Sequence, residues 1–130
     1  MKIKTNKKHQ THGDGEIDKQ KFKFLGENVI IEKNVLFFHC ENISISNNVY
    51  IGHNTILKGY YENEMSIGEG TWIGQNCFFH SAGGIKIGKA VGIGPSVKIL
   101  TSSHINDNLN KPVLHNPLKL DKVEIKDGAD

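Results

Sequence analysis

A six-residue repeat between Leu25 and Ile125 constrains the fold of this chain more than any other feature. An aliphatic or phenylalanine side chain recurs every six positions, and a glycine or small polar residue often follows it. These positions are Leu25, Ile31, Phe37, Ile45, Ile51, Leu57, Ile67, Ile73, Phe79, Ile87, Ile93, Ile99 and Ile125. A period of six matches neither an α-helix nor the two-residue alternation of a plain strand. It is typical of β-solenoids built from hexapeptide repeats.

The interruptions of the repeat predict the shape of the solenoid. The apolar positions come in triplets, and the steps between successive triplets are 8, 10, 8 and 26 residues. Three hexads therefore make one three-sided coil, and every insertion falls at the same corner. We expect an all-β fold, a parallel β-helix with coils about 4.8 Å apart. The predicted columns are Leu25/Ile45/Ile67/Ile87/Ile125, Ile31/Ile51/Ile73/Ile93 and Phe37/Leu57/Phe79/Ile99.

The same spacing divides the chain into parts. Residues 1–22 are polar and rich in lysine, which predicts an N-terminal arm, and residues 23–130 make the β-helix domain. The longest interval in the repeat predicts a loop over residues 101–122 that leaves the solenoid. Loops of this length in a compact domain are usually functional. The repeat stops within a hexad at Ala129 and Asp130. Because a solenoid needs its last coil covered, we expect a shortened form of a longer solenoid, or a partner at this end.

Bulk properties narrow the classes of partner. A formal net charge of +2 gives no electrostatic reason to expect nucleic acid as a partner. No segment is apolar enough for a membrane span or a secretion signal, so we expect a cytoplasmic protein. The two cysteines, Cys40 and Cys77, fall in different coils, and we expect no disulfide between them.

The fourth coil and its loop carry a more specific pattern. The coil reads Ile85-Lys86-Ile87-Gly88, Val91-Gly92-Ile93-Gly94-Pro95 and Val97-Lys98-Ile99, and the loop opens with Thr101-Ser102-Ser103-His104. This pattern resembles the hexapeptide-repeat acyltransferases, especially the maltose- and galactoside-type sugar O-acetyltransferases. The resemblance covers the chain from about Leu25 onward.

The resemblance implies a left-handed coil, a homotrimer and acetyl-coenzyme A bound between subunits as acyl donor. His104 matches the family's catalytic histidine. Its role would be that of general base, removing a proton from a hydroxyl of a sugar or cell-surface saccharide precursor. Backbone N–H groups would then hold the oxyanion. The residues that contact the coenzyme are left unassigned, and no metal is expected.

Two further residues are candidates for substrate binding. Asn76 aligns approximately with an asparagine that touches the acceptor in the sugar acetyltransferases, although Asn34 and Asn54 occupy the same hexad position and favour a turn role. His80 lies at the looping corner one coil before His104, and we expect it to line the acceptor pocket. Within the loop, Asn106 and Asp107 either orient His104 or belong to an ordinary turn. Trp72 points outward by the strand alternation and is available for a subunit contact.

Departures from the family leave alternatives open. The chain lacks the longer helical segment before the first coil and the coils after the loop, and it has Ser103-His104-Ile105 where the family usually has Gly-His-Pro. One alternative is N-acetylation of a nucleotide-linked amino sugar, and another is a non-catalytic structural solenoid or solenoid fragment. A γ-type carbonic anhydrase shares the fold, but His39, His53 and His80 lack the short spacing of its zinc ligands.

Overall fold

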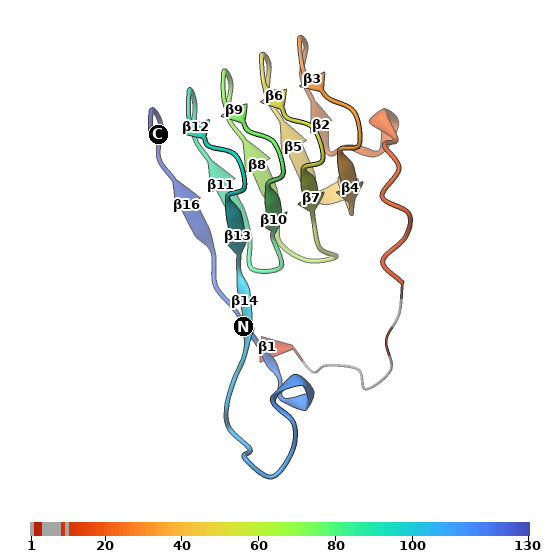
Figure 1. Cartoon of the computed structure of the whole chain (residues 1–130), viewed down its shortest axis with the longest axis vertical. Helices are drawn as coiled ribbons and strands as arrows, with labels where there is room; N and C mark the ends of the chain where they lie inside the picture. The colour runs from red at the N-terminus through yellow and green to blue at the C-terminus, as the bar shows by residue number, and fades with distance from the viewer. Residues whose placement is uncertain (1, 4–8, 10) are drawn as a thin grey trace.

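The computed structural model describes residues 2–3, 9 and 11–130, and its described part is built from short β-strands with no α-helix. The strands stack as four coils of a three-sided solenoid, with a fifth coil begun by β16 (Figure 1). Wall 1 contains β2 (Phe24–Leu25), β5 (Ile43–Ile45), β8 (Met65–Ile67), β11 (Ile85–Ile87) and β16 (Val123–Ile125). Wall 2 contains β3 (Ile30–Ile31), β6 (Tyr50–Ile51), β9 (Trp72–Ile73) and β12 (Gly92–Ile93). Wall 3 contains β4 (Leu36–Phe38), β7 (Ile56–Lys58), β10 (Phe78–His80) and β13 (Lys98–Leu100).

The register of the three walls confirms the predicted columns. Strands within each wall run parallel, and the inward residues face their counterparts one coil away, as Ile51 faces Ile73 and Ile73 faces Ile93. The pair Ile87 and Ile125 is in register despite the long excursion between them. The architecture is therefore the three-sided parallel β-helix predicted from the residue intervals, and it is consistent with a left-handed coil.

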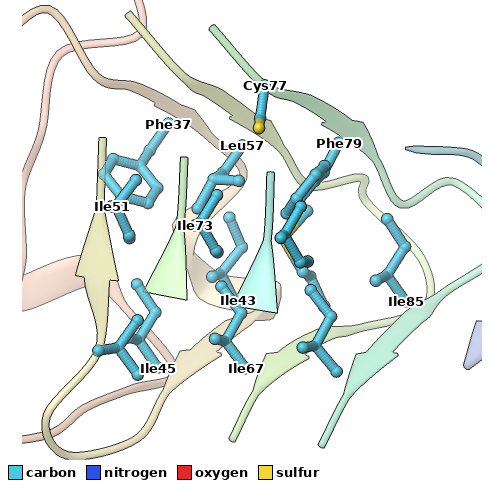
Figure 2. Packing of buried hydrophobic residues seen from close by; sticks show 14 of the residues in the cluster. Phe37, Ile43, Ile45, Ile51, Leu57, Ile67, Ile73, Cys77, Phe79 and Ile85 are labelled. Carbon is cyan, nitrogen blue, oxygen red and sulfur yellow. The ribbon is translucent and has the colours of Figure 1, made fainter. Parts of the chain in front are cut away.

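The core runs along the axis of the solenoid. Ile51, Leu57, Ile73 and Phe79 have no exposed surface, and they fill the space between the walls in successive layers (Figure 2). Two inward threonines are also buried, and each hydroxyl donates to a backbone carbonyl of the next coil. Thr55 Oγ1 lies 3.0 Å from the oxygen of Gly74, and Thr71 Oγ1 lies 2.9 Å from that of Gly88. Buried hydroxyls thus avoid the cost of unpaired polar groups and tie neighbouring coils together.

The N-terminal segment covers the first coil. Here η1 (Lys19–Lys21) begins after Asp18, whose side chain accepts from the backbone N–H of Gln20. Phe22 is buried and meets Phe37 edge to face, with ring centroids 4.9 Å apart. The core therefore begins at Phe22, one residue before the predicted start of the β-helix domain. The carbonyl of Gly15 accepts from Phe37 N–H at 3.0 Å, so this segment also blunts an edge that would otherwise be open.

The long excursion forms a hairpin that projects from one corner of the stack (Figure 1). β14 (Ser102–His104) and β15 (Leu118–Leu120) pair antiparallel, and β1 (Lys2–Ile3) adds to the other side of β15. Between them lies η3 (Val113–His115); the remaining short helix, η2 (Cys40–Asn42), is in the first insertion. We call the corner between walls 3 and 1, where all insertions fall, the insertion corner.

The root of the hairpin is anchored to the coil before it. Thr101 is buried, and its hydroxyl donates to the carbonyl of His80 at 2.6 Å and accepts from Gly83 N–H at 2.9 Å. Leu120, at the returning end, is 5% exposed. The hairpin therefore leaves the solenoid from a fixed base.

None of the helices in the described residues has the length and apolar character that a membrane crossing requires.

Candidate functional site

His104 ends the outgoing strand of the hairpin and is held in one orientation. It faces Leu118 across the β14–β15 pair, and its Nδ1 lies 2.7 Å from the backbone carbonyl oxygen of Asn116. A carbonyl oxygen only accepts, so Nδ1 carries the proton and donates it. The other ring nitrogen, Nε2, then has a free lone pair, which is the form that a general base requires. The ring is half-buried.

Local backbone chemistry puts the Asn116 carbonyl in this place. Pro112 and Pro117 bracket the short helix η3, and a proline cannot extend a helix or donate to a strand pair. The turn closes when Asn116 N–H donates to the carbonyl of Val113 at 2.9 Å. Beyond it, Ile105 N–H donates to the carbonyl of Pro117 at 2.9 Å, which extends the hairpin past His104.

The group that orients His104 is therefore a backbone carbonyl. The sequence offered Asn106 and Asp107 for this role, but the structure places both as exposed residues beyond the end of β14. Asn116 was missed because its contribution comes from the main chain, which residue identity does not reveal. The only signal for it was the Asn116-Pro117 pair, which is typical of a turn.

His80 lies at the same corner, one coil before the hairpin. It ends β10 and points outward from wall 3, beside Lys58 in the register. Burial lowers the pKa of His80 from 6.5 to about 4, and the charges of Lys58 and His12 add to this effect. Its imidazole is therefore neutral at neutral pH.

The polar edge of His80 is unusual. Within the described part of the chain its Nε2 is buried and has no hydrogen-bond partner. The ring of Tyr60 meets the imidazole edge-on, with centroids 5.9 Å apart. Buried polar atoms without partners are rare in folded proteins.

His80 lies at the insertion corner, and His104 lies on the hairpin that projects from this corner. His80 faces Leu100 in the next strand of wall 3, and its carbonyl binds the Thr101 hydroxyl three residues before His104. The prediction that His80 lies next to the looping chain agrees with this placement. Its role as a substrate contact stays a prediction.

Asn76 lies elsewhere. It occupies the corner between walls 2 and 3, is exposed, and has a φ of 59°. Its N–H donates to the carbonyl of His53 at 3.0 Å, and Asn34 and Asn54 take the same left-handed conformation at equivalent positions. These contacts describe a turn residue, and within one chain wall 3 separates it from the insertion corner.

Across the described residues, no group of three or more histidine, cysteine, aspartate or glutamate side chains has an arrangement that could hold a metal ion. Cys40 and Cys77 are both buried free thiols. His39 pairs with Glu41 at 2.8 Å, and His53 with Glu32 at 3.3 Å.

Comparison of the chain with protein-family models, with curated proteins and with solved structures finds no significant match. Fold and site together define a class of protein, a three-sided β-solenoid that carries one oriented histidine on a hairpin at its insertion corner.

Proposed function

We propose that this protein is an acetyltransferase that moves the acetyl group of acetyl-coenzyme A to a hydroxyl of a sugar or saccharide precursor, with His104 as general base. The observation that carries the proposal is the hydrogen bond from His104 Nδ1 to the Asn116 carbonyl. It leaves Nε2 as the proton acceptor. The likeness of the fourth coil and its loop to the sugar O-acetyltransferases supplies the reaction class.

In the proposed reaction, His104 Nε2 takes the proton of the acceptor hydroxyl while the hydroxyl oxygen attacks the thioester carbonyl carbon. The Asn116 carbonyl stabilises the imidazolium that forms, because it accepts from Nδ1–H throughout. When the carbon–sulfur bond breaks, His104 returns the proton to the departing thiolate. The products are the acetyl ester and the free coenzyme thiol.

His80 would contribute to acceptor binding. What supports this role is a neutral imidazole edge-on to the ring of Tyr60 at the insertion corner. Asn76 would reach the same acceptor only in an oligomer, because its corner lies across wall 3 from His104 within one chain. A homotrimer, as the resemblance implies, would supply Asn76 from a neighbouring copy. Because acetyl-coenzyme A is the donor, the proposal also places the protein in the cytoplasm.

The test is thiol release from acetyl-coenzyme A with a panel of sugars and amino sugars. We expect release that depends on the acceptor, and roughly a 10²- to 10⁴-fold loss in His104→Ala. The matched control is His115→Ala, a half-buried histidine of the same hairpin, which should stay within about threefold of the parent since it lacks the orienting contact.

The panel also separates the alternatives. Turnover only with acceptors that carry an amino group would indicate N-acetylation in place of O-acetylation, with His104 still the base. Equal rates in the parent and His104→Ala would remove the base assignment. No release with any acceptor would favour a structural solenoid.

A further inference from the structure

A cleft opens on the outer surface of wall 1, next to the insertion corner. It has a volume of about 380 Å³ and spans three successive coils. The third coil contributes Glu64 and Ser66, the fourth Gly84 and Lys86, and the fifth Lys122. A hollow of this volume is within the range of pockets that hold small molecules in proteins.

The cleft is open because Gly84 has no side chain. Glu64, Gly84 and Lys122 each directly precede a strand of wall 1, and the parallel register of β8, β11 and β16 places them in one column. A Cβ built on Gly84 would lie 3.6 Å from the carbonyl oxygen of Glu64 and 3.6 Å from Cγ of Lys122. These are ordinary contact distances, so the space above Gly84 has room for an atom of a ligand.

Two ammonium groups border this space. Lys86 and Lys122 are both exposed, and in the part of the chain that the structure describes neither side chain makes an ion pair or a hydrogen bond. Lys86 lies in the middle of the wall, with Ser66 beside it in the preceding coil and Glu124 beside it in the following one. Ser66 is half-buried, and its hydroxyl adds a hydrogen-bond donor to the cleft.

The carboxylates around the cleft are engaged with other lysines. Glu64 is paired with Lys23, and Glu124 is paired with Lys126 at 2.9 Å. The hydrogen bond from Lys126 and its charge lower the pKa of Glu124, and the charges of the two cleft lysines add to this effect. Both cleft lysines therefore act on the same region. Because four lysines share it with two glutamates, its balance of charge is positive.

The charge of the cleft favours an oxyanion with two negative charges. Lysine binds phosphate groups as a point charge, and a phosphate monoester is largely a dianion at neutral pH. Such a group compensates both ammonium groups at once, whereas a single carboxylate would leave one of them without a partner. The cleft is also larger than a phosphoryl group, so it has space for the organic part of a phosphorylated compound.

The geometry points to a binding site for the phosphoryl group of a small phosphorylated compound, formed by Lys86, Lys122 and Ser66. The two lysines bind the phosphoryl oxygens, and the Ser66 hydroxyl donates to one of them. The site lies on wall 1 and uses no residue of the proposed acetyl-transfer site. Failure of either proposal therefore leaves the other intact.

The test is isothermal titration calorimetry of the full chain with glucose 1-phosphate, with inorganic phosphate and with glucose. We expect saturable binding of glucose 1-phosphate that weakens with added salt, and binding of glucose weaker by roughly tenfold or more because it lacks the charge. Equal affinity for the two phosphate compounds would show that the phosphoryl group alone is bound. A higher affinity for glucose 1-phosphate would show that the cleft also holds the organic part.

Three variants test the cleft directly. Lys86→Gln and Lys122→Gln each remove one ammonium group, and each should weaken phosphate binding by roughly five- to tenfold through the loss of a charge-assisted hydrogen bond. Ser66→Leu keeps both charges and fills the space between them, so it should weaken binding as well. The matched control is Lys98→Gln, an exposed lysine of the fourth coil on wall 3, which should leave the affinity unchanged.

Three results would overturn the inference. The first is no binding of either phosphate compound, and the second is equal affinity for glucose 1-phosphate and glucose. The third is an equal effect of Lys86→Gln, Lys122→Gln and Lys98→Gln, which would show general attraction to a basic surface. The comparison of glucose 1-phosphate with glucose needs no variant, so it decides the matter even if a variant fails to fold.

Discussion

His80 lies at the insertion corner and His104 on the hairpin that projects from it, and the two side chains have different surroundings. His104 donates from Nδ1 to a backbone carbonyl and keeps Nε2 as an acceptor. His80 has a buried nitrogen without a partner in the described chain, and a pKa lowered to about 4 by burial, with Lys58 and His12 adding to the shift. One histidine thus keeps an accepting nitrogen, and the other stays neutral at neutral pH.

The lowered pKa of His80 predicts acid sensitivity. Its folded-state pKa of about 4 lies below the ordinary 6.5, so the unfolded chain binds a proton between these values and the folded chain does not. The free energy of unfolding therefore contains a contribution that is full above about pH 6.5 and is lost as the pH falls toward about 4. We expect His80→Gln to lose less thermal stability than the parent between neutral pH and about pH 5. Identical pH dependence in the two proteins, measured by circular dichroism, would remove this account of His80.

Side chains on the two faces of wall 3 should differ sharply in their effect on stability. Phe79 is fully buried, whereas Leu100, in the neighbouring strand, points outward and is 61% exposed. Phe79→Ala should cost about 3–5 kcal/mol in the free energy of unfolding. Leu100→Ala should change it by less than about 0.5 kcal/mol. Denaturant titration measures both, and similar losses would contradict the assignment of the inner face.

At the scale of elements, the corners of the coils decide how closely successive coils approach. Gly68 lies directly against the backbone of the next coil, where an added Cβ would be 2.7 Å from the nitrogen of Lys89. Gly94 occupies the equivalent hexad position at another corner, and an added Cβ there meets no atom within 4 Å. Neither glycine has a positive φ, so a left-handed backbone does not distinguish them.

This difference gives a matched pair of substitutions. Gly68→Ala should destabilise the protein by about 1–3 kcal/mol, because the clash is with backbone and the coils must move apart. Gly94→Ala should be neutral or stabilise by up to about 1 kcal/mol, since alanine loses less conformational entropy on folding. Melting temperatures of the two variants give the comparison. A larger loss in Gly94→Ala would mean that the coils are spaced differently at these corners.

Elements also differ in how far the sequence predicted them. The columns of the solenoid followed from residue intervals, because one coil has the same geometry as the next and the spacing Ile51, Ile73, Ile93 repeats it. The hairpin has no such repeat. The contact that orients His104 comes from the main chain of Asn116. The root of the hairpin is held by the Thr101 hydroxyl, which bonds to the preceding coil. Phe22 packs into the core from a position between two lysines, outside the six-residue repeat.

At the scale of the whole molecule, the stacked coils form the hydrophobic core, and His104 lies on a hairpin outside them. Each coil contacts only its neighbours, so stability is distributed along the axis. The oriented histidine lies on the hairpin that projects from the insertion corner, outside the stacked coils (Figure 1). Residues 1, 4–8 and 10 of the predicted N-terminal arm lie outside the described structure.

The most direct test of the central claim is the rate of acceptor-dependent thiol release in the parent and in His104→Asn. The amide nitrogen of asparagine takes the place of Nδ1 and still donates to the Asn116 carbonyl, so the hairpin keeps its contact while the proton acceptor is removed. We predict a melting temperature close to that of the parent and a rate lower by roughly 10²- to 10⁴-fold. A folded His104→Asn protein that releases thiol as fast as the parent would contradict the claim that His104 is the base.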